Sequence, residues 1–151
     1  QQLSPMGRGW SPEVPRHFWG NFGSKHVLFQ QISKDIEKSL IGKGVTNYQN
    51  LVGKTTIEEL INQISSLNLF ITGDSGPMHV AAASQVPTVA IFGPTRDDET
   101  SQWMNEKSVV VKKTLDCQPC MQRNCPLQHH NCMKLIKASE VFDVTKSLIK
   151  H

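Results

Sequence analysis

Apolar residues along the chain follow two patterns, short continuous runs and stripes that recur every three or four positions. Largely apolar runs occupy 67–72, 87–92 and 109–111, and each is followed by glycine or by charged residues. Runs of this length bounded by turn residues are typical of strands that are buried on both faces. Shorter runs at 26–29 and 50–52 predict two more short strands.

Stripes at helical spacing lie between and after these runs. They occupy 32–40, 57–64, 78–83 and 141–149, and Thr56 is placed to cap the second of them. The first 25 residues hold seven glycines and prolines, which predicts an irregular start. Strands that alternate with helices indicate an α/β fold. We therefore expect one Rossmann-like, three-layer domain with a parallel sheet.

Composition and charge exclude several classes of protein. The 151 residues suit one domain, and 16 Lys and Arg against 13 Asp and Glu give a net charge of +3, too small and too scattered to indicate nucleic-acid binding. No stretch approaches the roughly 20 apolar residues of a membrane-crossing helix. The chain begins with Gln1 instead of Met and shows no signal-peptide pattern, so we expect a processed chain or a piece of a longer protein.

The end of the run at 67–72 carries the most unusual polar residues. It continues as Thr72-Gly73-Asp74-Ser75-Gly76-Pro77-Met78-His79. Ligands of parallel sheets bind at the carboxyl ends of strands, glycines permit close approach, and amides at a helix start favour an anion such as a diphosphate. An ordinary helix start explains the same residues, with Asp or Ser as the N-cap, Pro in the first turn and His79 packed inside.

Two other segments are weaker candidates for ligand contact. Phe92-Gly93-Pro94-Thr95 is by itself a turn, but it follows a neighbouring strand and can face the same crevice. Gly53-Lys54-Thr55-Thr56 imitates the end of a phosphate-binding loop. The glycine that such a loop requires further upstream is missing, so we reject a P-loop and keep Lys54 and Thr55 as plausible contacts.

Four cysteines lie within sixteen residues, at Cys117, Cys120, Cys125 and Cys132, with His129 and His130 in the last interval. Four thiolates, or three with a histidine, can bind zinc tetrahedrally. The spacing is not the usual pair of CxxC knuckles, so reduced thiols lining a loop, or a disulfide formed on oxidation, remain alternatives. Because a stapled secreted domain usually spreads its cysteines over the chain, we expect a reducing compartment.

Several of these segments together resemble the ADP-heptose:lipopolysaccharide heptosyltransferases. The resemblance lies in NLVGKT at 50–55, FITGDSGPMHVAAA at 70–83 and VPTVAIFGPT at 86–95. The Cys-x-Pro-Cys loop followed by Cys125-Pro126 and Cys132-Met133 is also seen in members of the heptosyltransferase II type. The resemblance extends from about residue 26 to the end of the chain, and its Asp-Ser-Gly-Pro-Met-His segment is the most specific part.

The resemblance implies a glycosyltransferase-B architecture of two Rossmann-like domains. Residues 1–151 then form the C-terminal, nucleotide-sugar-binding half, with an irregular start at 1–25 and a cysteine-containing loop at 113–134. The N-terminal acceptor domain is absent from the sequence. The family's presumed general base, an aspartate, belongs to that domain, so no catalytic residue is expected in this chain.

The resemblance also assigns donor-binding residues. Lys54 and Thr55 match the nucleotide edge, and Arg8 is a substitute for the family's diphosphate-binding cation. Residues 11–25 depart most from the family pattern, and Asp35 and Glu37 are weakly placed ribose-binding candidates. The complete predicted donor-binding set is Arg8, Lys54, Thr55, Asp74, Ser75, Gly76, Pro77, Met78, His79, Gly93 and Thr95.

The activity that the resemblance implies is transfer of heptose from ADP-heptose to the lipopolysaccharide inner core, with no cofactor required for catalysis. Alone, the chain is expected to bind ADP or ADP-heptose without turnover. The expected location is the cytoplasm, with peripheral association at the inner membrane as a further expectation. Two alternatives are another sugar-nucleotide transferase or epimerase of this architecture, and a zinc-stabilised domain without enzymatic activity.

Overall fold

A computed structural model describes residues 22–149, and the chain divides into two compact units, Gln1–Thr55 and Thr56–His151. In the first unit, helix α1 (Phe22–Gly42) runs through the stretch 26–29, so the strand predicted there is wrong. Residues 22–25 of the predicted irregular start are helical as well, and the rest of that prediction lies outside the described residues. The strand predicted at 50–52 is also wrong. Asn50 instead accepts a hydrogen bond from the backbone N–H of Val52 at 3.0 Å, and Gly53 has a φ of +71°. This segment is a turn.

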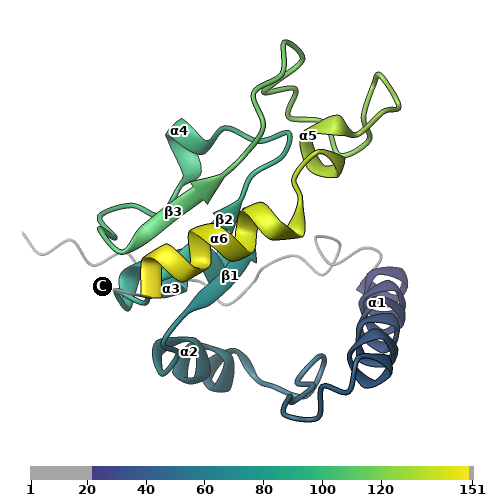
Figure 1. Ribbon diagram of the computed structural model, residues 1–151, viewed down its shortest axis with the longest axis vertical. Helices are drawn as coiled ribbons and strands as arrows, with labels where there is room; N and C mark the ends of the chain where they lie inside the picture. Colours follow the sequence, from purple (N-terminus) through teal and green to yellow (C-terminus); the bar gives the residue numbers. More distant parts are fainter. Residues whose placement is uncertain (1–21, 150–151) are drawn as a thin grey trace, which may run out of the picture. The chain divides into compact units, whose positions relative to one another are not determined.

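The second unit alternates strands and helices along the chain (Figure 1). The sheet of its described residues has the order β1-β2-β3, and both neighbouring pairs are parallel. The predicted strands and major helices of this unit are confirmed, and two short helices, α4 and α5, were not predicted. The elements are α2 (Ile57–Ser65), β1 (Phe70–Gly73), α3 (Gly76–Ala83), β2 (Thr88–Ile91), α4 (Asp97–Thr100), β3 (Ser108–Val111), α5 (Asn131–Lys134) and α6 (Ala138–Ile149).

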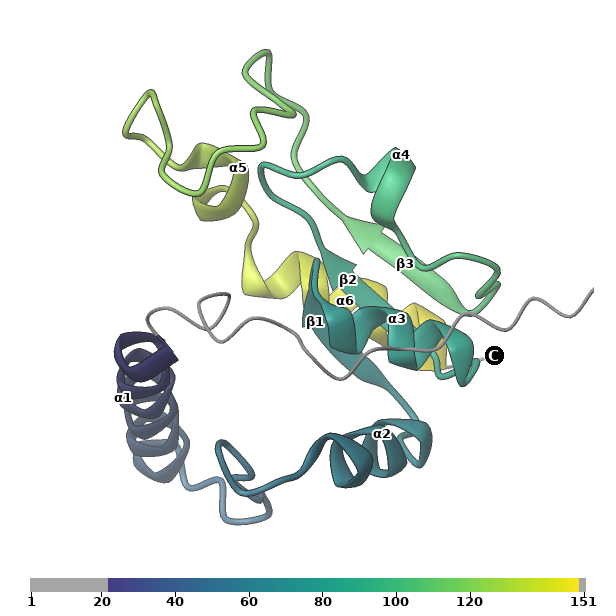
Figure 2. The same ribbon diagram turned by 180° about the vertical axis from the view of Figure 1, so that it is seen from behind.

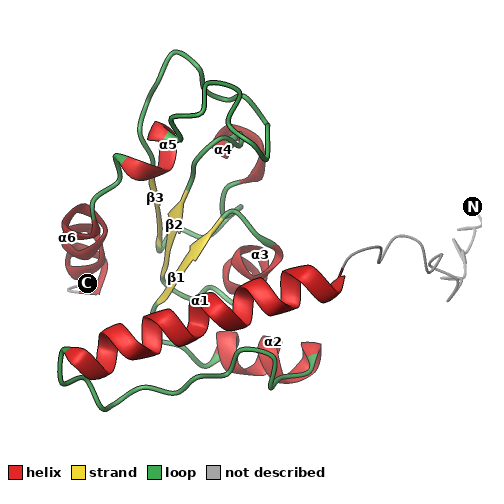
Figure 3. Cartoon of the chain, turned by 90° about the vertical axis from the view of Figure 1, so that its right-hand side faces the viewer, coloured by secondary structure: helices red, strands yellow, loops and turns green. Residues whose placement is uncertain are grey.

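Helices cover both faces of this sheet. Helix α3 packs on β1 and β2, whereas α6 packs on β2 and β3 from the other side (Figure 3). The view from behind shows α3 in front of the strands with α2 beside it (Figure 2). Because β2 is central, Thr88, Val89 and Ala90 are fully buried. This arrangement confirms the α/β, three-layer fold with a parallel sheet.

Helix α2 begins with a capping box, as the position of Thr56 in the sequence predicted. The Thr56 hydroxyl accepts a hydrogen bond from the backbone N–H of Glu59 at 3.2 Å, and the Glu59 carboxylate accepts one from the backbone N–H of Thr56 at 2.7 Å. Hydrogen bonding of the Glu59 carboxylate to Thr56, above all to its backbone N–H, lowers the pKa of Glu59. The capping box therefore satisfies two backbone donors at the start of the second unit.

We expect Thr56→Ala to lower the free energy of unfolding of the second unit by about 1 kcal/mol, the usual cost of losing an N-cap hydroxyl. The matched control is Glu58→Gln in the same turn, which removes a charge but no cap. Urea denaturation followed by circular dichroism compares the two variants. Equal, negligible losses would show that the box does not stabilise the helix.

Candidate functional site

The turn after β1 is held together by its own hydroxyl groups. The hydroxyls of Thr72 and Ser75 lie 3.2 Å apart, and each donates to the carbonyl oxygen of Gly73. The half-buried Asp74 carboxylate accepts a hydrogen bond from the Thr100 hydroxyl at 3.3 Å. This bond links the β1 turn to α4, so the Asp74 side chain is positioned by an element that follows β2.

Helix α3 starts directly after this turn. Ser75 is its N-cap residue, but the Ser75 side chain makes no capping hydrogen bond, and Pro77 lies in the first turn. Met78 is fully buried, whereas His79 is exposed, so the alternative that His79 packs inside the domain is wrong. A Cβ added at Gly76 would meet no atom within 4 Å. A ligand therefore has room to approach the backbone closely at Gly76.

The turn after β2 is packed tightly. This packing favours Gly93 as a residue of the turn over Gly93 as a ligand contact. A Cβ at Gly93 would lie 2.5 Å from the Met133 sulfur, so any larger residue must displace that side chain. The Gln118 amide donates to the Gly93 carbonyl oxygen at 2.6 Å, and the backbone N–H of Met121 donates to the Pro94 carbonyl oxygen at 2.9 Å. The cysteine-containing loop is thus fastened onto this turn.

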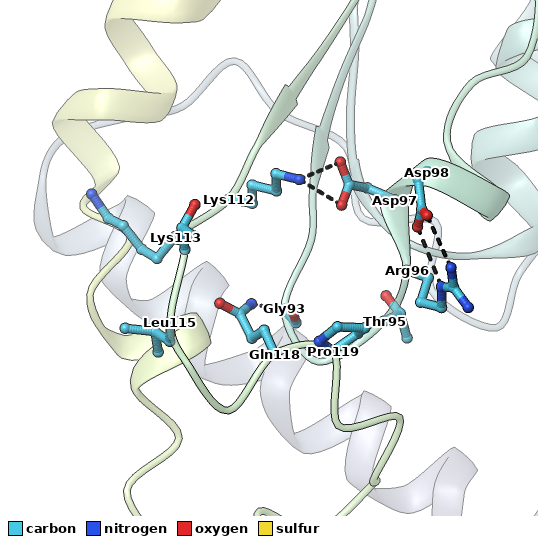
Figure 4. Close-up of a pocket in the computed structure, with 11 residues that line it drawn as sticks. Gly93, Thr95, Arg96, Asp97, Asp98, Lys112, Lys113, Leu115, Gln118 and Pro119 are labelled. Carbon is cyan, nitrogen blue, oxygen red and sulfur yellow. Dashed lines mark hydrogen bonds and ion pairs between the residues drawn. The ribbon is translucent and has the colours of Figure 1, made fainter.

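A cavity of about 490 Å³ opens where β2 and β3 end (Figure 4). Sequence reasoning placed Gly93 and Thr95 here and missed the other lining residues. The signal available for residues 96–98 and 112–114 was their position soon after two strand ends, which is where ligands of parallel sheets bind. The missed lining residues are Arg96, Asp97, Asp98, Lys112, Lys113, Thr114, Leu115, Gln118 and Pro119.

Ion pairs organise the charges around this cavity. Lys112 reaches the Asp97 carboxylate at 2.6 Å, as Figure 4 shows, and Arg96 contacts Asp98 at 3.0 Å. The hydrogen bond from Arg96 lowers the pKa of Asp98 and raises that of Arg96. These pairs are partly exposed and contribute little stability. An incoming phosphate group can therefore replace a carboxylate as the partner of Lys112.

A second, smaller cavity of about 200 Å³ lies within the cysteine-containing loop. All four cysteines line it together with His129 and His130, and all four are free thiols. Backbone N–H groups, that of His130 above all, lower the pKa of Cys125. Within residues 22–149, no three His, Cys, Asp or Glu side chains are close enough together to hold a metal ion as they stand.

The remaining predicted donor-binding residues lie outside the second unit. Lys54 and Thr55 belong to the first unit, where Lys54 follows the Gly53 turn and lines a cavity of about 560 Å³ together with Glu37 and Tyr48. Arg8 lies outside the described residues. The second unit thus contains the Asp74–Thr100 contact and the cavity beside α4, whereas Lys54 lines a separate cavity in the first unit.

Sequence comparison relates the chain to a group of transferases. A family model described as glycosyltransferase family 9 (heptosyltransferase) matches residues 18–131. Lipooligosaccharide heptosyltransferase 2 of Campylobacter jejuni serotype O:2 is 46% identical over 139 residues, which cover 87% of this chain and 43% of that relative. Lipopolysaccharide heptosyltransferase 2 of Salmonella typhimurium is 30% identical over 134 residues, covering 85% and 38%. The chain spans less than half the length of these relatives.

Structural comparison agrees with the fold described above. The structure of Escherichia coli ADP-heptose LPS heptosyltransferase II matches with a TM-score of 0.65 and 24% sequence identity. The match covers 80% of this chain and 33% of that one. It confirms the predicted fold class, an α/β domain that corresponds to one part of a larger chain.

Proposed function

The chain belongs to glycosyltransferase family 9, the heptosyltransferases, and from this premise we propose that it forms the donor-binding half of an enzyme that transfers heptose from ADP-heptose to the lipopolysaccharide inner core. The observation that carries the proposal is the turn between β1 and α3. There a carboxylate, a hydroxyl and an open helix start lie side by side at the carboxyl end of a parallel strand.

In the proposed reaction, an acceptor hydroxyl attacks the anomeric carbon of the donor heptose. The bond between that carbon and the diphosphate oxygen breaks, ADP leaves with the bonding electron pair, and the acceptor proton passes to a base. We place that base, an aspartate, and the acceptor site in the N-terminal domain of a glycosyltransferase-B architecture. The relatives are long enough to include such a domain, since the matched region is 43% or less of their length.

The residues of this chain contribute binding and electrostatics. Asp74 accepts hydrogen bonds from sugar hydroxyls, and the amides at the start of α3 face the diphosphate, because a helix N-terminus favours negative charge. We assign stabilisation of the charge that develops on departing ADP to cations, with Lys54 and Arg8 as the candidates. Gly76 leaves the backbone open to close approach.

The lipid-linked acceptor suggests where the enzyme works. No helix within residues 22–149 is both long and apolar enough to cross a membrane. We propose that the protein acts in the cytoplasm and meets its acceptor at the inner face of the inner membrane by peripheral contact. ADP-heptose and the lipopolysaccharide core are its proposed partners.

Nucleotide titration tests the donor assignment. We expect isothermal titration of the chain with ADP to show binding and UDP to bind at least about tenfold more weakly, a difference of about 1.4 kcal/mol. Preference for UDP would instead favour a different sugar-nucleotide transferase or epimerase of the same architecture. Steady heptose transfer by the chain alone would contradict the assignment of the general base to another domain.

A further inference from the structure

The cysteine-containing loop is built around one small cavity, and donor binding does not account for its thiols. Cys117 and Cys120 approach the cavity from one segment, Cys125 from the next, and Cys132 from α5. Cys132 is buried and the other three are half-buried. Thiols from three segments thus line one cavity of about 200 Å³.

Non-glycine residues of this loop adopt left-handed backbone close to the cysteines. Met121, which directly follows Cys120, has a φ of +54°, and Gln128 has a φ of +58° where its N–H donates to the Cys125 carbonyl oxygen at 3.0 Å. Left-handed backbone is unfavourable for residues other than glycine. Such positions persist only where the surrounding structure requires them, and they concentrate at functional sites.

The loop is also anchored at a fixed place on the domain. Gln118 and Met121 bind the carbonyl oxygens of Gly93 and Pro94 at 2.6 Å and 2.9 Å. Met133 packs where a Gly93 side chain would be. The first cysteine pair and Cys132 are therefore both held against the turn that ends β2, although 11 residues lie between Cys120 and Cys132 in the sequence.

From this geometry we propose that Cys117, Cys120, Cys125 and Cys132 form a structural site for a thiophilic divalent cation, with Zn²⁺ as the matching ion. Soft thiolates select zinc over hard cations, and four of them complete its tetrahedral shell. Since no three donors among residues 22–149 stand at binding distance, the thiols must move toward one another around the ion. Three of the four thiols lie on loop segments outside the helices and strands.

The histidines are less suitable ligands than the fourth cysteine. The Nδ1 atom of His129 accepts a hydrogen bond from the backbone N–H of Asn131 at 3.0 Å. A neutral imidazole with an accepting Nδ1 carries its proton on Nε2, which then has no lone pair to offer a metal. His130 is exposed. This favours four thiolates over three thiolates and a histidine.

Metal binding by the reduced chain tests the site directly. We expect native mass spectrometry to find one Zn²⁺ per chain, and Co²⁺ titration to give the intense thiolate-to-metal absorption of a tetrahedral site. Cys125→Ser and Cys132→Ser are each expected to weaken Zn²⁺ binding more than roughly 100-fold, beyond the range for residues that only support a ligand. His129→Ala is the matched control within the same cavity and should keep the ion.

Three results would overturn the proposal. One is failure of the reduced, unmodified chain to take up Zn²⁺ or Co²⁺, which does not depend on any variant folding. Another is loss of the ion in His129→Ala but not in Cys132→Ser. The third is a disulfide among the four cysteines, found by alkylation and mass spectrometry, that forms equally fast with and without Zn²⁺. ADP titration of the same samples separates this outcome from failure of the proposed donor site.

Discussion

Replacing Asp74 by Asn is expected to weaken binding of ADP-heptose by roughly 10- to 100-fold, because a hydrogen bond to a charged group contributes about 1.5–3 kcal/mol. The substitution preserves the shape of the side chain and its bond to Thr100, which lies 3.3 Å from one carboxylate oxygen. It removes the charge that strengthens contact with sugar hydroxyls. Because Asp74 is assigned to the sugar, ADP affinity should change much less. Isothermal titration with both ligands measures the two effects.

Two controls make the Asp74 result specific. Asp143→Asn changes an exposed carboxylate of α6 that pairs with Lys146 three residues later, and it should leave both affinities unchanged. Thr100→Val removes the hydroxyl that positions Asp74, and it should weaken ADP-heptose binding by a smaller factor than Asp74→Asn does. Equal losses of ADP and ADP-heptose affinity in Asp74→Asn would place Asp74 at the nucleotide instead of the sugar.

The central strand β2 was predictable because it is buried on both faces and therefore forms a continuous apolar run. The neighbouring strand β1 is not buried on both faces, since Ile71 is 48% exposed. Thr88 to Ala90 are fully buried, and this stretch lies inside the predicted strand. The stretch 26–29 failed for the reason that makes short apolar runs ambiguous, since its length cannot distinguish a strand from one turn of a longer helix. Here α1 continues past it to Gly42. At 50–52, the Asn50 side chain binds the backbone and competes with strand formation.

The candidate site was predictable only where it follows a strand directly. Asp74 and Thr95 follow β1 and β2 and were found in this way, whereas Gln118 reaches the Gly93 carbonyl oxygen from 25 positions away. Nothing local in the sequence specifies that return of the loop. Gly93 was predicted as part of a turn and as a weaker candidate for donor contact, and the close approach of the Met133 side chain to it is seen only in the folded chain.

Phe92→Ala is expected to lower the free energy of unfolding of the second unit by about 3–5 kcal/mol, the usual range for a large aromatic side chain removed from a core. Phe92 is 1% exposed and belongs to a buried cluster with Met78 and Ala90, against which Val110 also packs. Since whole domains are stable by only about 5–15 kcal/mol, this loss is a large share. Urea denaturation and amide hydrogen exchange of β2 measure it within this unit.

The same substitution should also weaken donor binding in the fraction that remains folded. Phe92 directly precedes Gly93 in the turn that ends β2, and it packs in one cluster with Met78 in the first turn of α3. The cavity left by Phe92→Ala therefore lies beneath both turns. Phe92→Leu is the graded control, because it leaves a smaller cavity and should cost less stability and less affinity. A loss below about 1 kcal/mol for Phe92→Ala would mean that the core closes around the gap. An unchanged ADP affinity despite a large loss of stability would show that the two turns keep their shape without this aromatic support.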